Sequence, residues 1–216
     1  GFGAARILPL VERGLRRARP KILVGYSDAT AILAFASSRL GWATFHGPMV
    51  ASDFPTLRPR DLRAFAQVLG GEAIPPFRLA RAYRRGVAEG ALVGGCLSIL
   101  VSMLGTPYFP KLAGSLLFLE DVNEEPYQLD RMLTQLRLSG VLARVRGIVF
   151  AVMARCGRPR EMHAVLAERT ADLGVPVAYG LASGHGRGKR TLPLGVRARL
   201  DGGRRRLEIL ETPVSK

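Results

Sequence analysis

The sequence predicts an α/β protein, and two stretches of the chain are the basis of that prediction. Residues 21–49 contain a strand-like run, a helix-like segment and a second strand-like run, the order typical of a parallel sheet. Residues 115–180 contain three further apolar runs separated by two segments of helical length. A hairpin signal closes the chain, so we expect antiparallel pairing there in addition to parallel pairing.

The N-terminal elements can be placed in order. Residues 4–19 have a helix-like pattern, and we expect Pro9 to split or shorten that helix. The strand at 21–25, "KILVG", leads directly into a helix at 28–41 that ends on a glycine. Residues 43–49, "ATFHGPM", are expected to form a short strand that runs into a Gly-Pro turn.

The middle of the chain has a different composition. Residues 51–88 contain a proline-rich stretch with a single amphipathic helix near residues 61–69, which is typical of a connector. We therefore divide the chain into an N-terminal lobe (1–50), a linker (51–88) and a C-terminal lobe (89–216).

The C-terminal lobe is expected to begin with a buried helix at 97–104. Strands and helices then alternate, and Asp201-Gly202-Gly203 is expected to join two final β runs as a hairpin. The alternating segments are strands at 115–121, 146–153 and 175–180 and helices at 126–140 and 159–174.

The composition narrows the class of protein. The chain has 216 residues and is 48% hydrophobic, enough for a sizeable core. It contains no apolar run long enough to span a bilayer and no signal-peptide layout, so we expect no membrane partner. Two cysteines, Cys96 and Cys156, are too few for a disulfide framework and fit a reducing, cytoplasmic setting.

The net charge of +15 raises the question of nucleic-acid binding. The basic residues are spread along the chain, however, and the nearest approach to a basic block, Arg204 to Arg206, is interpreted as a solvated hairpin. We expect no nucleic-acid partner. A basic module that binds nucleic acid or an anionic wall polymer stays open as a minority hypothesis.

Ser27 lies where a strand is expected to meet a helix, in the stretch Gly25-Tyr26-Ser27-Asp28-Ala29. Ser and Asp are common helix caps, and capping is the simpler interpretation of this residue taken alone. The alternative is a nucleophile on a sharp turn of the G-x-S-x-G type, with alanine in place of the second glycine.

A serine nucleophile needs a base, and the chain has three histidines. His46 lies at the end of the strand that follows the Ser27 helix, so it could be nearby. His163 is expected in the middle of a helix, pointing to water. His185 lies in the glycine-rich loop "GLASGHGRGKR", which suits either a catalytic base or an inert surface loop.

The orienting acid is sought in "LLFLEDVNEEPYQLD". Glu120 ends an apolar strand, where α/β folds place their sites, and a buried carboxylate there would need a partner. Glu125 precedes a proline and fits a simple role at a helix start. No metal-ligand spacing such as HExxH or C-x-x-C is present, and no Walker or complete dinucleotide glycine pattern, so we expect no metal and no cofactor.

Several segments, taken together and in order, resemble the LD-carboxypeptidases, a family of serine peptidases that includes murein tetrapeptide carboxypeptidases and microcin C immunity peptidases. The segments are "GFGAARILPL", "PKILVGYSDATAI", "TFHGPM", "GGCLSILVSMLGTPY", "LLFLEDVNEEPYQLDRMLTQLRLSG", "GHG" and "TLPLGVRARLD". Family members normally begin with a further α/β stretch. The resemblance therefore implies the remnant of an N-terminal parallel α/β (Rossmann-like) lobe that bears the nucleophile, plus a C-terminal mixed α/β lobe.

The resemblance also implies a Ser–Glu–His triad of Ser27, Glu120 and His185, with Glu124 as the alternative acid. The backbone N–H of Asp28 would be one oxyanion donor, and the glycine turn that begins at Gly1 would supply the second. Cys96 stands where many relatives have asparagine, a departure near the expected lobe interface.

The activity implied is release of the terminal D-Ala from murein tetrapeptides, through an acyl-enzyme, by a cytoplasmic homodimer. The substrate carboxylate needs a cationic or N–H-rich pocket, for which Arg131 and Arg187 are both candidates. The rival activity is that of a microcin immunity peptidase, which is expected to need an aromatic side chain in a loop near the triad. Trp42 is interpreted as a core residue, which favours the muropeptide substrate. A further alternative is an inactive fragment.

Overall fold

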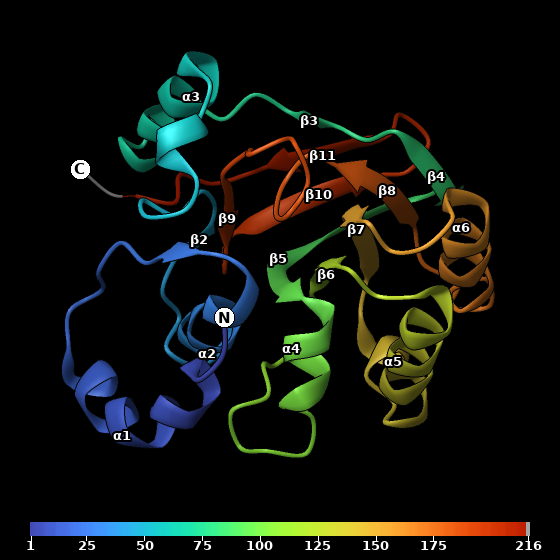
Figure 1. Ribbon diagram of the computed structural model, residues 1–216, viewed down its shortest axis with the longest axis horizontal. Helices are drawn as coiled ribbons and strands as arrows, with labels where there is room; N and C mark the ends of the chain where they lie inside the picture. The colour runs from blue at the N-terminus through green and yellow to red at the C-terminus, as the bar shows by residue number, and fades with distance from the viewer. Residues whose placement is uncertain (215–216) are drawn as a thin grey trace.

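The computed structural model describes residues 1–214, which form two β-sheets surrounded by helices (Figure 1). The smaller sheet has the order β1-β2-β9, with β1 (Val24–Gly25) parallel to β2 (Thr44–His46). The helix between them, α2 (Thr30–Arg39), completes the strand–helix–strand unit expected at the N-terminus. β9 (Leu192–Leu194) comes from the far end of the chain and pairs with β2 in the antiparallel sense.

The larger sheet has eight strands in the order β3-β11-β10-β5-β6-β7-β8-β4. Its centre is parallel and consists of β5 (Val87–Cys96), β6 (Leu116–Val122), β7 (Gly147–Ala154) and β8 (Val177–Leu181). The sequences of β6 and β7 are almost entirely apolar because both faces of these strands are covered.

The edges of this sheet are antiparallel, so the fold is the mixed α/β arrangement that the sequence predicts. β10 (Arg197–Asp201) and β11 (Arg206–Ile209) form the expected hairpin, and β10 pairs with β5. Two short strands complete the edges, β3 (Phe77–Arg78) beside β11 and β4 (Arg81–Arg84) beside β8.

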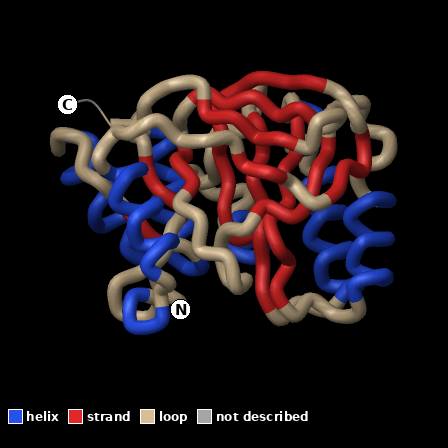
Figure 2. Tube along the Cα trace, turned by 90° about the horizontal axis from the view of Figure 1, so that it is seen from above, coloured by secondary structure: helices blue, strands red, loops and turns tan. Residues whose placement is uncertain are grey.

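Alternate residues of β6 separate two hydrophobic cores. Leu117 and Leu119 pack with the helices α4 (Leu97–Ser102), α5 (Pro126–Leu138) and α6 (Pro159–Glu168) on one face. Leu116 and Phe118 pack on the other face against residues of β3, β9, β10 and β11. Figure 2 shows the strands gathered in the middle of the molecule with helices on both sides.

The N-terminal helix, α1 (Ala4–Arg17), continues through Pro9, so the expected break at this proline is wrong. Pro9 lacks an N–H and cannot bond the carbonyl of Ala5. Both residues are exposed, however, and water can satisfy that carbonyl. The chain therefore remains helical at the cost of one internal hydrogen bond.

The segment that we expect to link the lobes, 51–88, contains helix α3 (Pro59–Leu69) and both edge strands β3 and β4, and its last residues begin β5. Three short 3₁₀ turns complete the elements: Ser27–Ala29, Phe54–Thr56 and Leu142–Arg144. None of the helices within residues 1–214 is both long enough and apolar enough to cross a membrane.

Candidate active site

Ser27 lies on a sharp turn between β1 and α2, with a positive φ of 59°. Non-glycine residues adopt this left-handed conformation only when the surrounding structure requires it, at a cost of about 1–3 kcal/mol. Gly25 permits the turn, because a Cβ at this position would lie 2.8 Å from the Cβ of Ala29. Neither the 3₁₀ turn nor α2 receives a side-chain cap, so the simple capping interpretation of Ser27 is wrong.

Asp28 holds the start of the chain against this turn. Its Oδ2 accepts a hydrogen bond of 3.0 Å from the backbone N–H of Ala4, the first residue of α1. A Cβ placed on Gly1 would lie 3.2 Å from the Cβ of Asp28, so the Gly1-Phe2-Gly3 turn lies directly beside the Ser27 turn. The structure therefore brings the two segments expected to supply oxyanion donors together.

Glu120 and His185 are in direct contact although they are far apart in the sequence. The Nδ1–H of His185 donates to Glu120 Oε2 at 2.7 Å, and the backbone N–H of His185 approaches the same oxygen at 3.3 Å. Gly184 has φ of +91°, and a Cβ there would lie 2.4 Å from Glu120 Oε2. The glycine before His185 is therefore required for the loop to approach the carboxylate this closely.

Glu120 is fully buried and stays ionised because of its histidine neighbours. Burial by itself would raise the pKa of this carboxyl, but the hydrogen bond from His185 and the nearby imidazole of His46 outweigh that effect and lower the pKa to about 2. A carboxylate in this state fixes the Nδ1–H tautomer of His185, which leaves Nε2 free to accept a proton.

Tyr26 places the Ser27 turn against the histidine. Its ring lies edge-on to the ring of His185, with 4.9 Å between the centroids. Within residues 1–214, the Ser27 hydroxyl makes no direct hydrogen bond to His185. Catalytic hydrogen bonds are often long before substrate binds, so the absence of this bond is compatible with a nucleophile and its base.

Lys189 ties the same loop to the Ser27 turn, a role that the sequence analysis missed. Its ammonium group contacts Asp53 Oδ1 at 2.9 Å, the Tyr26 hydroxyl at 3.1 Å and the Gly184 carbonyl at 3.1 Å. Burial alone would lower the pKa of Lys189, but the bonds to Asp53 and Tyr26 outweigh it and keep the pKa above its ordinary value. The sequence offered one signal for this role: Lys189 closely follows the stretch "GHG" in a chain whose basic residues are mostly arginine.

The other carboxylates of the 120–125 turn have different neighbours. Glu124 is half-buried, and its pKa is raised first by that burial and then by Asp121; it does not contact His185. Glu125 forms a capping box with Gln128 at the start of α5, which confirms its simple structural interpretation.

Asp121 accepts hydrogen bonds from the first turn of α4 and from Cys96, the residue that precedes this helix. Asp121 Oδ2 accepts from the backbone N–H of Ser98 at 2.8 Å, and Oδ1 accepts from the Cys96 thiol at 3.4 Å. Burial, reinforced by Asp121, raises the pKa of the thiol, so Cys96 remains protonated and acts as a donor. Cys96 thus donates a hydrogen bond to Asp121 at the position where the family resemblance leads us to expect asparagine in many relatives.

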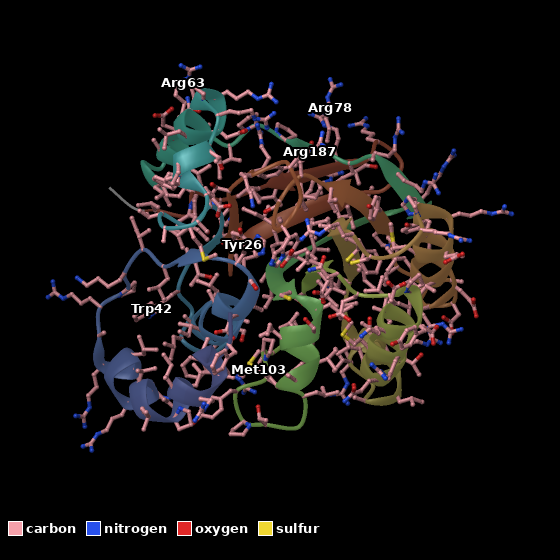
Figure 3. The ribbon with its side chains drawn as sticks, viewed as in Figure 1. Tyr26, Trp42, Arg63, Arg78, Met103 and Arg187 are labelled. Atoms are coloured by element: carbon pink, nitrogen blue, oxygen red, sulfur yellow. The ribbon has the colours of Figure 1, made fainter. Side chains whose placement is uncertain are left out.

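Two further residues singled out from the sequence, His163 and Trp42, make other contacts. His163 does not point to water as expected, because its ring bonds the Tyr83 hydroxyl and packs edge-on against Tyr179. Trp42 is buried, which confirms its interpretation as a core residue, and Figure 3 shows it in the N-terminal lobe, apart from Tyr26. In the described part of the chain, no three His, Cys, Asp or Glu side chains gather in a group that could hold a metal ion.

Comparison with known proteins matches both halves of the chain to one family. Residues 1–47 match the LD-carboxypeptidase N-terminal domain and residues 89–200 match the LD-carboxypeptidase C-terminal domain. The murein tetrapeptide carboxypeptidase of Pseudomonas aeruginosa is 36% identical over 226 residues, which cover 95% of this chain and 71% of that protein.

Solved structures agree with this assignment. The muramoyltetrapeptide carboxypeptidase from Oxalobacter formigenes is 31% identical with a TM-score of 0.79, and the match covers 98% of this chain and 72% of that one. The microcin C7 self-immunity protein MccF, from Escherichia coli, is 25% identical with a TM-score of 0.87 and covers 100% and 75%.

The chain spans about two thirds of the length of the curated relatives that it matches. The two matched domains account for most of its residues, and the fold agrees with that of the solved relatives. The chain therefore belongs to the LD-carboxypeptidase family.

Proposed function

We propose that this protein is a serine carboxypeptidase that releases the terminal D-Ala from murein tetrapeptides. The observation that supports this best is the bond between the buried Glu120 and His185, whose ring packs against Tyr26 on the strained turn of Ser27. The relatives named as murein tetrapeptide and muramoyltetrapeptide carboxypeptidases support the choice of substrate.

Each group of the proposed triad has one role. Ser27 Oγ attacks the carbonyl of the L,D-peptide bond while His185 Nε2 takes the hydroxyl proton. The backbone N–H of Asp28 and the turn at Gly1 stabilise the oxyanion. His185 then protonates the leaving amine of D-Ala. In the second step His185 takes a proton from water as the water attacks the acyl-enzyme, and it returns that proton to Ser27 Oγ as the acyl group leaves. Glu120 holds and stabilises the His185 imidazolium throughout.

The test is a D-Ala release assay with a purified muropeptide that ends in a tetrapeptide. We expect Ser27→Ala to remove activity to near the detection limit. Ser102→Ala is the matched control, because Ser102 is a serine of α4 that bonds only a local carbonyl, that of Ile99. Full activity in Ser27→Ala would refute the assignment of the nucleophile.

A second candidate function is the immunity-type activity, favoured by the TM-score of 0.87 to MccF. A solved complex of MccF contains aspartyl sulfamoyl adenosine, which makes that compound a direct probe. Binding of this probe, combined with no release of D-Ala, would favour the second function over the first.

The setting that fits this function is the bacterial cytoplasm, with the protein acting as a homodimer. Both cysteines are buried free thiols, which agrees with a reducing compartment. Light scattering of the eluting peak in size-exclusion chromatography measures the oligomeric state, and a mass near 23.4 kDa would refute the dimer.

A further inference from the structure

His46 contacts the oxygen of Glu120 that His185 does not use. Its Nε2 lies 3.7 Å from Glu120 Oε1, and neither side chain is exposed to solvent. The ring packs edge-on against Phe118 at 4.8 Å between centroids and lies 6.0 Å from the ring of Tyr26. The triad carboxylate therefore lies between two histidines, only one of which belongs to the proposed triad.

The hydrogen bonds of Ser183 determine which ring nitrogen of His46 carries the proton when the imidazole is neutral. The Ser183 hydroxyl donates to the backbone carbonyl of Arg190 at 2.8 Å, and a carbonyl can only accept. That bond uses the single hydrogen of the hydroxyl. Ser183 Oγ must then accept from His46, so the Nδ1 of His46, 3.0 Å away, is protonated.

This placement leaves two acceptors face to face if His46 is neutral. The lone pair of Nε2 would point towards a carboxylate oxygen, and within residues 1–214 neither Nε2 nor Glu120 Oε1 has another hydrogen-bond partner. Leaving a buried polar atom unpaired costs about 1–3 kcal/mol, and more for a charged group. A second proton on Nε2 replaces this repulsion with an attraction, because it places a cation 3.7 Å from the buried carboxylate.

We propose that His46 is an imidazolium that donates to Ser183 through Nδ1–H and forms an ion pair with Glu120, with Nε2 3.7 Å from Oε1. In the proposed function, on which this role rests, His46 is a positioning residue that acts through Glu120. Its charge offsets that of the carboxylate, so Glu120 holds the imidazole of His185 in place without keeping it protonated. The Nε2 of His185 is then free to take the Ser27 proton, which a protonated His185 could not do.

The other charged groups near this cluster are already paired. Lys189 and Asp53 form an ion pair, and the Lys189 ammonium lies over the ring of Tyr26. Asp121 accepts hydrogen bonds from Cys96 and Ser98. The partners of His46 within the cluster are thus Glu120 and Ser183.

The first test counts the protons on the imidazole rings by long-range ¹H–¹⁵N NMR near pH 7.5. The chain has three histidines, so His163→Gln and His185→Gln assign the His46 signals by elimination even if a His46 variant fails to fold. We expect both nitrogens of His46 to be protonated, and Glu120→Gln to remove the Nε2 proton. A neutral His46 of either tautomer in the unmodified protein would overturn the proposal. This measurement needs no catalytic activity, so it is independent of the proposed function.

The second test compares pH profiles of kcat/KM for D-Ala release. His46→Gln retains an uncharged N–H donor but removes the positive charge, so we expect the acid limb to move upward by about one pH unit. His163→Gln, a histidine remote from the site, should leave the limb in place. A folded His46→Gln protein with an unshifted acid limb would overturn the proposed charge.

Discussion

At the scale of single residues, the site depends on one buried carboxylate. Glu120 is removed from water and receives hydrogen bonds from His185 at Oε2, with His46 facing Oε1. Its depressed pKa means that folding favours the ionised form, which contributes stability above the ordinary pKa of a glutamate. That contribution is lost as the pH falls from about 4.5 towards about 2.

Glu120→Gln is therefore expected to reduce the change in unfolding free energy with pH between about 4.5 and about 2. Urea unfolding of the wild type and the variant at pH values between 2 and 7 measures this, and the difference in unfolding free energy should shrink as the pH falls. At neutral pH the same variant should lose about 10²–10⁴-fold in kcat, because the amide no longer selects the productive tautomer of His185. A constant stability difference across this range would contradict the depressed pKa.

Arg187 is the arginine that we expect to bind the terminal carboxylate of the substrate. It is exposed, lies two residues after His185 in the same loop, and makes no ion pair within residues 1–214 (Figure 3). Arg131, in contrast, lies over the ring of Tyr127 on α5. Arg187→Ala should raise KM about tenfold, the scale of one charge-assisted contact, with a smaller effect on kcat.

The control for Arg187 is Arg63→Ala, an exposed arginine in the middle of α3 that Figure 3 shows at the outer edge of the molecule. An equal rise in KM in both variants would indicate a general effect of charge. No change in either would point to another group as the carboxylate partner.

At the scale of elements, the loop between β8 and β9 brings His185 to Glu120. It can do so because Gly184 has a positive φ and no Cβ where Glu120 Oε2 lies. Gly105 has a similar φ of +84° but open space around it. A substitution at Gly105 therefore introduces backbone strain alone, whereas one at Gly184 adds a steric clash with Glu120.

Gly184→Ala should reduce kcat about 100-fold, because the added methyl group pushes the loop away from the carboxylate. Gly105→Ala should cost about 1 kcal/mol in stability, from the strained φ alone, and leave kcat unchanged. Thermal unfolding and D-Ala release measure the two effects. Equal kcat values in the two variants would show that the close approach at Gly184 is not needed.

At the scale of the whole molecule, the proposed site combines residues from the N-terminal β1–α2 unit and from the larger sheet. Ser27 belongs to the β1–α2 turn, whereas Glu120 and His185 come from β6 and the loop after β8. Thr30, at the start of α2, joins them by accepting a hydrogen bond of 3.0 Å from the backbone N–H of Cys96 in β5. β9 adds a second connection, since it pairs with β2 of the smaller sheet.

Thr30→Val keeps the shape of this side chain but leaves the Cys96 N–H buried without a partner. We expect a loss of about 1–3 kcal/mol in unfolding free energy within a single cooperative transition. Thr56→Val is the control, because Thr56 is exposed and, within residues 1–214, its hydroxyl bonds only the carbonyl of Asp53. Two separate transitions in Thr30→Val would show that the lobes unfold independently.

Much of the fold was predictable because the elements have local signatures. The strand expected at 146–153, for example, agrees with β7 to within one residue at each end. The helix expected at 159–174 begins at Pro159 as expected but ends at Glu168, six residues early. The continuity of α1 through Pro9 was not predictable, because it depends on whether the Ala5 carbonyl is exposed to water. The contacts of His163 likewise depend on Tyr83, which lies on a distant strand.

For the candidate site, the sequence alone determined the residue types and the turns that present them: a serine after Gly25, a strand-terminal Glu120 and a histidine between glycines. These features are local, so a linear pattern is enough to find them. Only the tertiary structure decided which carboxylate meets His185, that Lys189 ties the loop to Tyr26, and that His46 faces the second oxygen of Glu120. Such contacts join positions from 65 to 163 residues apart, and they form only where the packing of β2, β6 and the loop after β8 brings those side chains into one buried space.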